Sequence, residues 1–156
     1  MEYQIIFEIS KISMGLLGFI LIGTIFIIIG ISIIKFQQKN IHKFFGYLFL
    51  TFSLLFTILS ASSIYTNHSF LRESYITKNY KTIEGIVENF AHTHNGKVES
   101  FSVKGINFKY SNGTITSGFN HTNSFGGPIR KGLKVRISYI NNIIIKLEIQ
   151  KSSLKI

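Results

Sequence analysis

The chain of 156 residues has no cysteine, no aspartate and no tryptophan, and it has a single proline, Pro128. Without cysteine there is no disulfide, thiol nucleophile, iron–sulfur cluster or cysteine-ligated zinc. Without aspartate there is no Asp-based calcium loop, aspartyl nucleophile or Asp-containing catalytic triad. All seven acidic residues are glutamates. These absences exclude many common metal and nucleophile chemistries before any pattern is considered.

Positive charge is in excess, with 17 Lys and Arg against seven Glu and a formal net charge of +10. Residues 77–156 contain twelve of these cations and four of the glutamates, so +8 of the charge belongs to the C-terminal half. A domain of this sign suits an anionic neighbour such as lipid head groups, an acidic protein or nucleic acid.

Two long apolar runs occupy the N-terminal half, residues 12–34 and 44–65, and neither contains a charged side chain. As helices, runs of 23 and 22 residues cross a hydrocarbon core of about 30 Å. Because neither run has a polar face, we predict two transmembrane helices rather than buried core helices. The first run is too long for a cleaved signal peptide and has no Ala-x-Ala site after it. Residues 1–11 are then an N-terminal tail.

The short basic loop between the runs, residues 35–43, has the sequence KFQQKNIHK, with three lysines and no acid. Nine residues are enough to turn a helical hairpin. The positive-inside rule places this loop in the cytoplasm, with both termini outside a bacterial inner (plasma) membrane. Cations also lie near the other ends of the runs, at Lys11, Arg72, Lys78 and Lys81. The positive charges are denser in the loop than at the other ends of the runs. We therefore predict a multi-pass protein with this loop in the cytoplasm.

Small residues recur in both runs and allow close helix packing. They are Gly15, Gly18, Gly23 and Gly30 in the first run, and Ser53, Thr57 and Ala61 in the second. We favour a seam within the hairpin over recruitment of another membrane protein or a second copy. Because neither run contains an ionisable residue, an ion or proton path is not expected.

An interfacial linker, residues 66–80, mixes aromatic and polar side chains, which suits the membrane interface. It either extends the second helix or lies on the membrane surface.

A β-domain is predicted for residues 81–150, followed by a tail at 151–156. The alternation of apolar and polar residues indicates five strands, at about 82–90, 99–111, 114–120, 132–140 and 144–150. The expected fold is therefore membrane α plus soluble all-β: a two-helix transmembrane hairpin followed by a small antiparallel five-stranded barrel or sandwich.

Three local patterns refine this β-domain. Asn112-Gly113 is a strong two-residue hairpin signal, and it would set Tyr110 opposite Ile115. The inward face changes parity at Lys104-Gly105, which indicates a bulge within one strand.

The third pattern lies near the C-terminus, where a loop of residues 141–143 would set Tyr139 opposite Ile145 and Ile137 opposite Leu147. We predict that three-residue loop or a bulge, with an Asn in the left-handed region.

Several segments together resemble a family of small bacterial membrane proteins. They are YKTIEGIVENF, ESFSVKGINFKYSNG, GFNHT, FGGPIRKG and VRISYINNIIIKLEI, in that order over residues 80–149. Members of that family carry a β-rich domain of unknown function behind a transmembrane segment or hairpin. The resemblance implies a bacterial envelope protein, and it supplies no catalytic residue.

Possible metal and catalytic sites are weak. His92 and His94 share a strand face, and with His121 they are weak candidates for a zinc or copper site. The four glutamates of the β-domain show no spacing typical of a catalytic pair, and FGGPIRKG lacks the Walker pattern. We therefore predict no enzyme and no cofactor.

Nucleic acid is an unlikely partner, because the aromatic residues of the β-domain alternate on its core face rather than its basic face. The basic candidates for interaction are Lys109, Arg130, Lys131, Lys134, Arg136 and Lys146. We predict an envelope-anchored, non-enzymatic interaction module that contacts a protein partner, a second copy or anionic head groups of the bilayer. The alternative is an accessory or immunity-type membrane protein that acts through its helices. A plain solvated basic surface is the third possibility.

Overall fold

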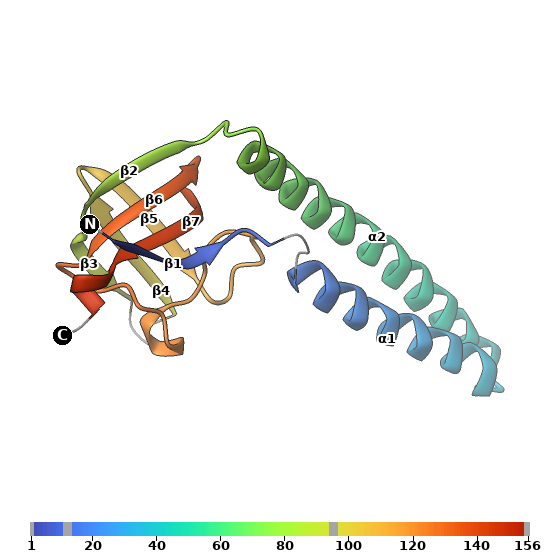
Figure 1. The fold of residues 1–156 in the computed structure, drawn as a ribbon. Coiled ribbons are helices and arrows are strands. Elements are labelled where there is room, and N and C mark those ends of the chain that lie inside the picture. Colours follow the sequence, from blue (N-terminus) through green and yellow to red (C-terminus); the bar gives the residue numbers. More distant parts are fainter. Residues whose placement is uncertain (1, 11–13, 94–96, 155–156) are drawn as a thin grey trace. The chain divides into compact units, whose positions relative to one another are not determined.

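A computed structural model describes residues 2–10, 14–93 and 97–154 (Figure 1). The elements in chain order are β1 (Tyr3–Glu8), α1 (Met14–Phe36), α2 (Asn40–Ile76), β2 (Lys81–Ile86), β3 (Glu88–His92), β4 (Val98–Val103), β5 (Ile106–Ser111), β6 (Lys134–Ile140) and β7 (Ile143–Gln150), with 3-10 turns at Asn123–Phe125 and Lys151–Leu154. They form two compact units. The helical unit is Ile12–His68, and the β-unit combines Met1–Lys11 with Ser69–Ile156.

The helical unit is a hairpin of α1 and α2, and both helices are long and apolar enough to cross a membrane. The predicted boundaries 12–34 and 44–65 were too narrow at the connection, because α1 continues to Phe36 and α2 begins at Asn40. The connection is therefore three residues rather than nine. Lysines are good helix formers, so the charged ends of the predicted loop extend the helices.

The second helix continues through most of the predicted linker and ends at Ile76, which resolves the alternative left open for residues 66–80. Lys78 adopts the left-handed conformation, with φ 58°. The Asn79 N–H then donates to the Ser74 carbonyl at 2.8 Å, and the Lys78 N–H donates to the Tyr75 carbonyl at 3.3 Å. This is a Schellman end, which satisfies the last carbonyls of the helix.

Small residues form the seam between the helices. A Cβ added at Gly23 would lie 2.5 Å from Thr57, and one added at Gly30 would lie 3.1 Å from Leu50. Ser53 is buried on the same seam.

The other small residues predicted to pack between the helices have different surroundings. Ala61 is half-buried, and Gly18 is exposed with open space where a Cβ would stand. Gly15 lies outside the residues whose surroundings are described. Gly46, which was not predicted, packs against Ile33 and Ile34.

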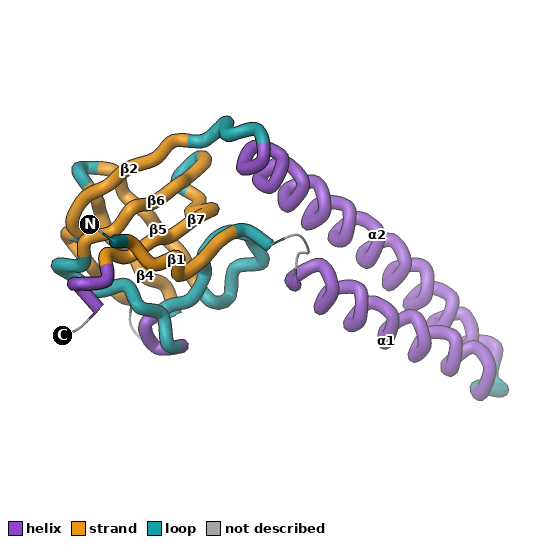
Figure 2. Tube along the Cα trace, in the orientation of Figure 1, coloured by secondary structure: helices purple, strands orange, loops and turns teal. Residues whose placement is uncertain are grey.

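In the described residues the β-unit has seven strands in two antiparallel sheets, ordered β1-β7-β6-β2 and β3-β4-β5 (Figure 2). The predicted combination of helix and antiparallel sheet is confirmed, but the count of five strands was wrong. The described strands form two separate sheets and no closed barrel. Inward side chains of both sheets meet in one core, with Phe101 and Phe108 on one side and Ile137, Leu147 and Ile149 on the other.

Two predicted strands are in fact two strands each. Segment 82–90 divides at Val87, a buried corner whose N–H donates to the Leu133 carbonyl, so β2 and β3 belong to different sheets. Segment 99–111 divides at Lys104-Gly105, which form a turn with φ values of 47° and 81° rather than a bulge. Across a two-residue turn the inward-facing residues change from odd to even numbers, which is the same change that had suggested a bulge.

The predicted strand 114–120 is absent, so Tyr110 does not pair with Ile115. Asn112-Gly113 does form a turn, with the Thr114 N–H donating to the Ser111 carbonyl at 3.1 Å. The chain then leaves the sheet, because the Asn120 side chain donates to the carbonyls of Thr114 and Thr116 and so holds the segment in a compact loop.

The last hairpin has the predicted bulge but a shorter loop. Asn141 and Asn142 form a two-residue turn with φ values of 47° and 64°. Ile137 lies opposite Leu147 as predicted, whereas Tyr139 lies opposite Ile144 rather than Ile145. The bulge turns Ile145 to the outer face, where it packs with Ile9 and Leu71.

The predicted N-terminal tail was also wrong, because residues 3–8 form β1. This strand pairs antiparallel with β7 from Tyr3 opposite Gln150 to Glu8 opposite Lys146. The predicted tail 151–156 begins with the 3-10 turn Lys151–Leu154, and Lys151 forms an ion pair with Glu2. The helical hairpin is therefore inserted in the sequence between β1 and β2 of one β-unit.

Candidate interaction surface

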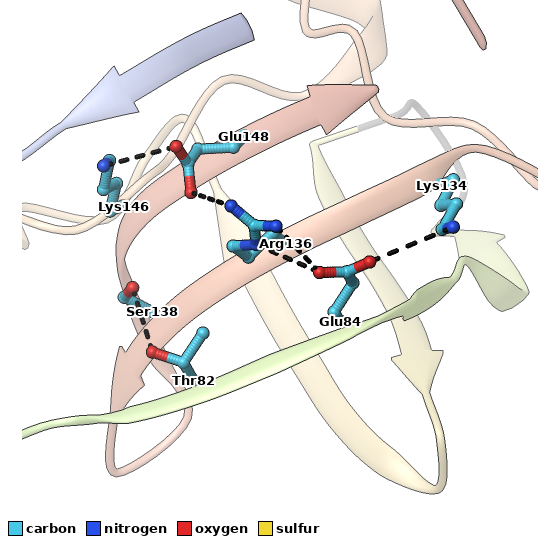
Figure 3. Close-up of polar contacts among 7 residues, drawn as sticks. All are labelled: Thr82, Glu84, Lys134, Arg136, Ser138, Lys146 and Glu148. Atoms are coloured by element: carbon cyan, nitrogen blue, oxygen red, sulfur yellow. Dashed lines mark hydrogen bonds and ion pairs between the residues drawn. The ribbon is translucent and has the colours of Figure 1, made fainter. Parts of the chain in front are cut away.

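The outer face of the four-stranded sheet carries a network of charged side chains centred on Arg136 (Figure 3). Arg136 Nη2 and Nε lie 3.0 and 3.1 Å from Glu84 Oε2, and Nη1 lies 4.0 Å from Glu148 Oε2. Lys146 Nζ is 3.3 Å from Glu148, and Lys134 Nζ is 3.9 Å from Glu84. The register of the strands produces this network, because Arg136 is opposite Glu84 on β2 and Glu148 on β7.

Tyr3 of β1 covers this network. The Arg136 guanidinium carbon lies 4.2 Å from the centroid of the Tyr3 ring, a cation–π contact. The Tyr3 hydroxyl and the Arg136 guanidinium hold the pKa of Glu84 below its ordinary value. Burial and the Glu84 carboxylate raise the pKa of Tyr3 to about 12. The hydroxyl influences Glu84 by proximity, since it has no hydrogen bond of good geometry among the described residues.

The six basic interaction candidates therefore fall into two groups. Lys134, Arg136 and Lys146 lie on the outer face as predicted, but two carboxylates neutralise them to a net +1. The other three candidates are exposed. Lys109 lies on β5, and Arg130 and Lys131 lie between β5 and β6. Across the described residues Lys109 and Lys131 take part in no ion pair. They are the better cations for an external anionic partner.

Arg130 and Lys131 belong to a long loop, residues 112–133, which is anchored on a buried carboxylate. Glu99 is only 1% exposed. Its Oε2 accepts a hydrogen bond from the Tyr110 hydroxyl at 2.6 Å, and its Oε1 accepts one from the Asn123 N–H at 2.7 Å. Burial and the Glu99 carboxylate raise the pKa of Tyr110 above its ordinary value.

Close backbone contacts hold the rest of the long loop. The Thr122 N–H donates to Asn112 Oδ1 at 3.0 Å. A Cβ at Gly127 would collide with the His121 carbonyl oxygen, which is rigid backbone, so only glycine fits there. At the end of the 3-10 turn Phe125 remains 61% exposed. The long loop thus presents an apolar side chain and two cations on a fixed backbone.

Among the described residues no histidine belongs to a group that could hold a metal ion. His92 ends β3 and His121 lies in the long loop, and both are exposed. His94 lies outside the described residues. Within the described ranges no group of three His, Cys, Asp or Glu side chains could hold a metal ion.

The sequence interpretation missed three residues of the charged network: Tyr3, Glu84 and Glu148. The alternation in VRISY and IKLEI placed Arg136 and Glu148 outward, but their pairing depends on strand register. Tyr3 had no usable signal, because its segment had been assigned to a tail.

No protein family model, curated protein or solved structure matches this chain. The resemblance to small bacterial membrane proteins with a β-rich domain therefore stays a prediction.

Proposed function

We propose that this protein is a non-enzymatic module anchored in the bacterial inner membrane, whose β-unit contacts an anionic partner outside the cytoplasm. The observation that carries the proposal is the insertion of the apolar hairpin between β1 and β2. If α1 and α2 both cross the bilayer, the two ends of the hairpin emerge on one side. The β-unit can then form from segments on both sides of the hairpin.

The surface of the helices supports a lipid environment. Large apolar side chains are exposed along both helices, including Leu21, Ile28, Phe52 and Leu59. Hydroxyl groups within the helices donate to carbonyls four residues earlier, which satisfies them without water. These pairs are Thr24 to Ile20, Ser32 to Ile28, Ser53 to Phe49 and Thr57 to Ser53, at 2.6–2.8 Å.

The exposed cations support contact with anionic lipid head groups. Each Lys or Arg near an anionic membrane surface contributes about 1 kcal/mol. Exposed Phe125 on the same loop as Arg130 and Lys131 adds an apolar contact. A protein partner with an acidic surface would use the same side chains.

The alternative, in which the helices themselves bind another membrane protein, has less support. Ser53 and Thr57, which had suggested it, lie on the seam with α1. Bulky substitutions there would disturb the hairpin and would not test an external partner. Charge reversal at Lys134 or Arg136 would similarly disturb the internal network.

Topology can be tested cleanly, because the chain has no cysteine. Single variants Gln4→Cys, Lys39→Cys and Ser124→Cys are labelled in cells with a reagent that does not cross the inner membrane. We expect labelling at positions 4 and 124, and labelling at position 39 only after lysis. Labelling of position 39 alone would reverse the orientation. Different results at positions 4 and 124 would contradict the two-span hairpin.

Head-group contact can be tested with a fluorescent probe on Ser124→Cys in nanodiscs. We expect a blue-shifted probe in discs that contain phosphatidylglycerol, compared with neutral phosphatidylcholine discs. The double variant Lys109→Glu/Lys131→Glu should abolish the difference, and Lys97→Glu, at another exposed lysine, should keep it. No lipid dependence in the unmodified sequence would leave an acidic protein as the partner to seek.

A further inference from the structure

A cavity of about 370 Å³ lies in the β-unit, beside the end of α2 and the turn between β6 and β7. Its lining residues are Phe70, Ser74, Asn79, Tyr80, Lys81, Tyr139, Ile140, Asn141 and Asn142. None of the residues assigned above to the interaction surface contributes to it. The cavity is therefore a separate feature of the β-unit.

Two lining residues, Ser74 and Tyr139, carry hydroxyl groups. Each residue is only 7% exposed. Neither hydroxyl oxygen is among the described buried polar atoms that lack a partner, so no unpaired buried group is left in this wall. Hydroxyl groups in the wall of a cavity can donate hydrogen bonds to a polar guest.

The charge of the lining indicates the sign of that guest. Among the described residues that line the cavity, Lys81 is the only charged one and none is a carboxylate. Lys81 lies directly opposite Tyr139 in the pairing of β2 with β6, so the two side chains share one face of the sheet. The nearby helix end carries partial negative charge, but the Lys78 and Asn79 N–H groups cap its carbonyls.

Three amides complete a lining rich in hydrogen-bond donors. Asn79, Asn141 and Asn142 all contribute to the wall, and Asn142 also donates to the Asn107 carbonyl at 2.9 Å. Left-handed backbone at Asn141 and Asn142 fixes their position. One ammonium group, two hydroxyls and several amides match a compact oxyanion with many acceptor oxygens.

We propose that this cavity binds a phosphate ester, with Lys81 as its counter-charge and Ser74 and Tyr139 as hydroxyl donors. The ester is the head group of a phospholipid or a soluble phosphate ester, and the two sources present the same chemistry to these side chains. The site goes beyond the interaction surface proposed above and does not depend on it.

The experiment uses the full chain in dodecyl maltoside, a detergent without phosphate. Backbone amide NMR shifts are followed while sn-glycerol 3-phosphate, glycerol or phosphatidylglycerol is added. We expect saturable shifts at Lys81, Asn141 and Asn142. A response to glycerol 3-phosphate identifies a soluble ester as sufficient, whereas a response to phosphatidylglycerol alone identifies the lipid. Glycerol, the phosphate-free match, should produce neither.

Substitutions of the lining residues test whether the ester binds in the cavity. Lys81→Gln should raise the Kd about tenfold, the usual scale for losing one charge-assisted hydrogen bond. Ser74→Ala and Tyr139→Phe, which keep the packing volume, should each raise it severalfold. Lys97→Gln, at an exposed lysine outside the cavity lining, should leave it unchanged. The proposal is overturned by no saturable shift with either ester, by equal shifts with glycerol, or by an unchanged Kd in folded Lys81→Gln.

Discussion

The Tyr110 hydroxyl donates a 2.6 Å hydrogen bond to the Glu99 carboxylate inside the β-unit, and the two residues are also cross-strand partners on β4 and β5. The second carboxylate oxygen accepts the Asn123 N–H of the long loop. Glu99 thus joins the three-stranded sheet to the segment that carries Phe125, Arg130 and Lys131. The position of the proposed interaction surface depends on this buried group.

Removing the Tyr110 hydroxyl should destabilise the β-unit. In Tyr110→Phe the buried Glu99 carboxylate loses one of its two hydrogen bonds, which costs about 1.5–3 kcal/mol. Urea unfolding of the full chain in detergent measures the change in free energy. Tyr65→Phe is the control, because that hydroxyl is on an exposed tyrosine. Equal midpoints for the two variants would contradict the anchoring role of Glu99.

Stability should fall in acid through Glu84. The Tyr3 hydroxyl and Arg136 hold the pKa of Glu84 below 4.5, so the unfolded chain binds its proton at a higher pH than the folded chain does. The resulting stabilisation is present above pH 4.5 and is lost as the pH falls through the folded pKa. Urea midpoints from about pH 6 to about pH 3 should therefore drop less steeply in Glu84→Gln.

Glu88→Gln is the matched control for this pH profile, because Glu88 is exposed and takes part in no ion pair among the described residues. As the pH falls, the urea midpoint of Glu88→Gln should drop as steeply as that of the unmodified chain. Parallel profiles for Glu84→Gln and the unmodified chain would show that the network around Arg136 does not affect folding.

The features that sequence predicted well are those specified locally. Uniform apolarity over 20 or more residues needs no partner to be recognised, and α1 and α2 followed from it. Asn141 and Asn142 likewise tolerate the left-handed region through their own side chains. The Schellman end of α2 had no such signal, because Lys78 is an unusual residue for that position.

The features that sequence missed depend on distant pairing. Tyr3 becomes part of a strand only through Gln150 and its neighbours at the other end of the chain. At Lys104-Gly105 the parity change was correctly detected, but a bulge and a tight turn produce the same change. Choosing between them required knowing that Phe101 faces Phe108.

The same limit applies to the candidate surface. Alternation placed Lys134, Arg136 and Lys146 outside the core, as observed. Their neutralisation by Glu84 and Glu148 follows from the register of three strands, which a pattern of single residues does not contain.

The same substitution at two glycines of α1 should have opposite effects. In Gly23→Ala the new methyl group meets both branches of Thr57 at 2.5 Å, so rotation of Thr57 gives no relief, and overpacking costs about 1–3 kcal/mol. In Gly18→Ala the methyl group enters open space, and better helix propensity stabilises by up to about 1 kcal/mol. Thermal unfolding followed by helical circular dichroism in detergent compares them.

A double variant locates this effect at the seam. Thr57→Ala removes the clashing branches, so Gly23→Ala/Thr57→Ala should be less destabilised than the sum of the two single variants. Additive losses would place the effect of Gly23→Ala elsewhere than at Thr57.

The N-terminal strand should be as protected from hydrogen exchange as the sheet that it joins. The Ile9 N–H donates to the Ile145 carbonyl at 2.9 Å, and the Ile9 side chain is buried with Leu71 and Ile145. Its exchange therefore requires the β-unit to open, whereas an unstructured tail would exchange freely. We expect Ile9 to exchange as slowly as the core amides of β7, and to exchange rapidly in Ile145→Asp, where a charge enters this cluster. Free exchange at Ile9 in the unmodified chain would return residues 1–11 to the tail that the sequence suggested, and the insertion of the hairpin into one β-unit would lose its basis.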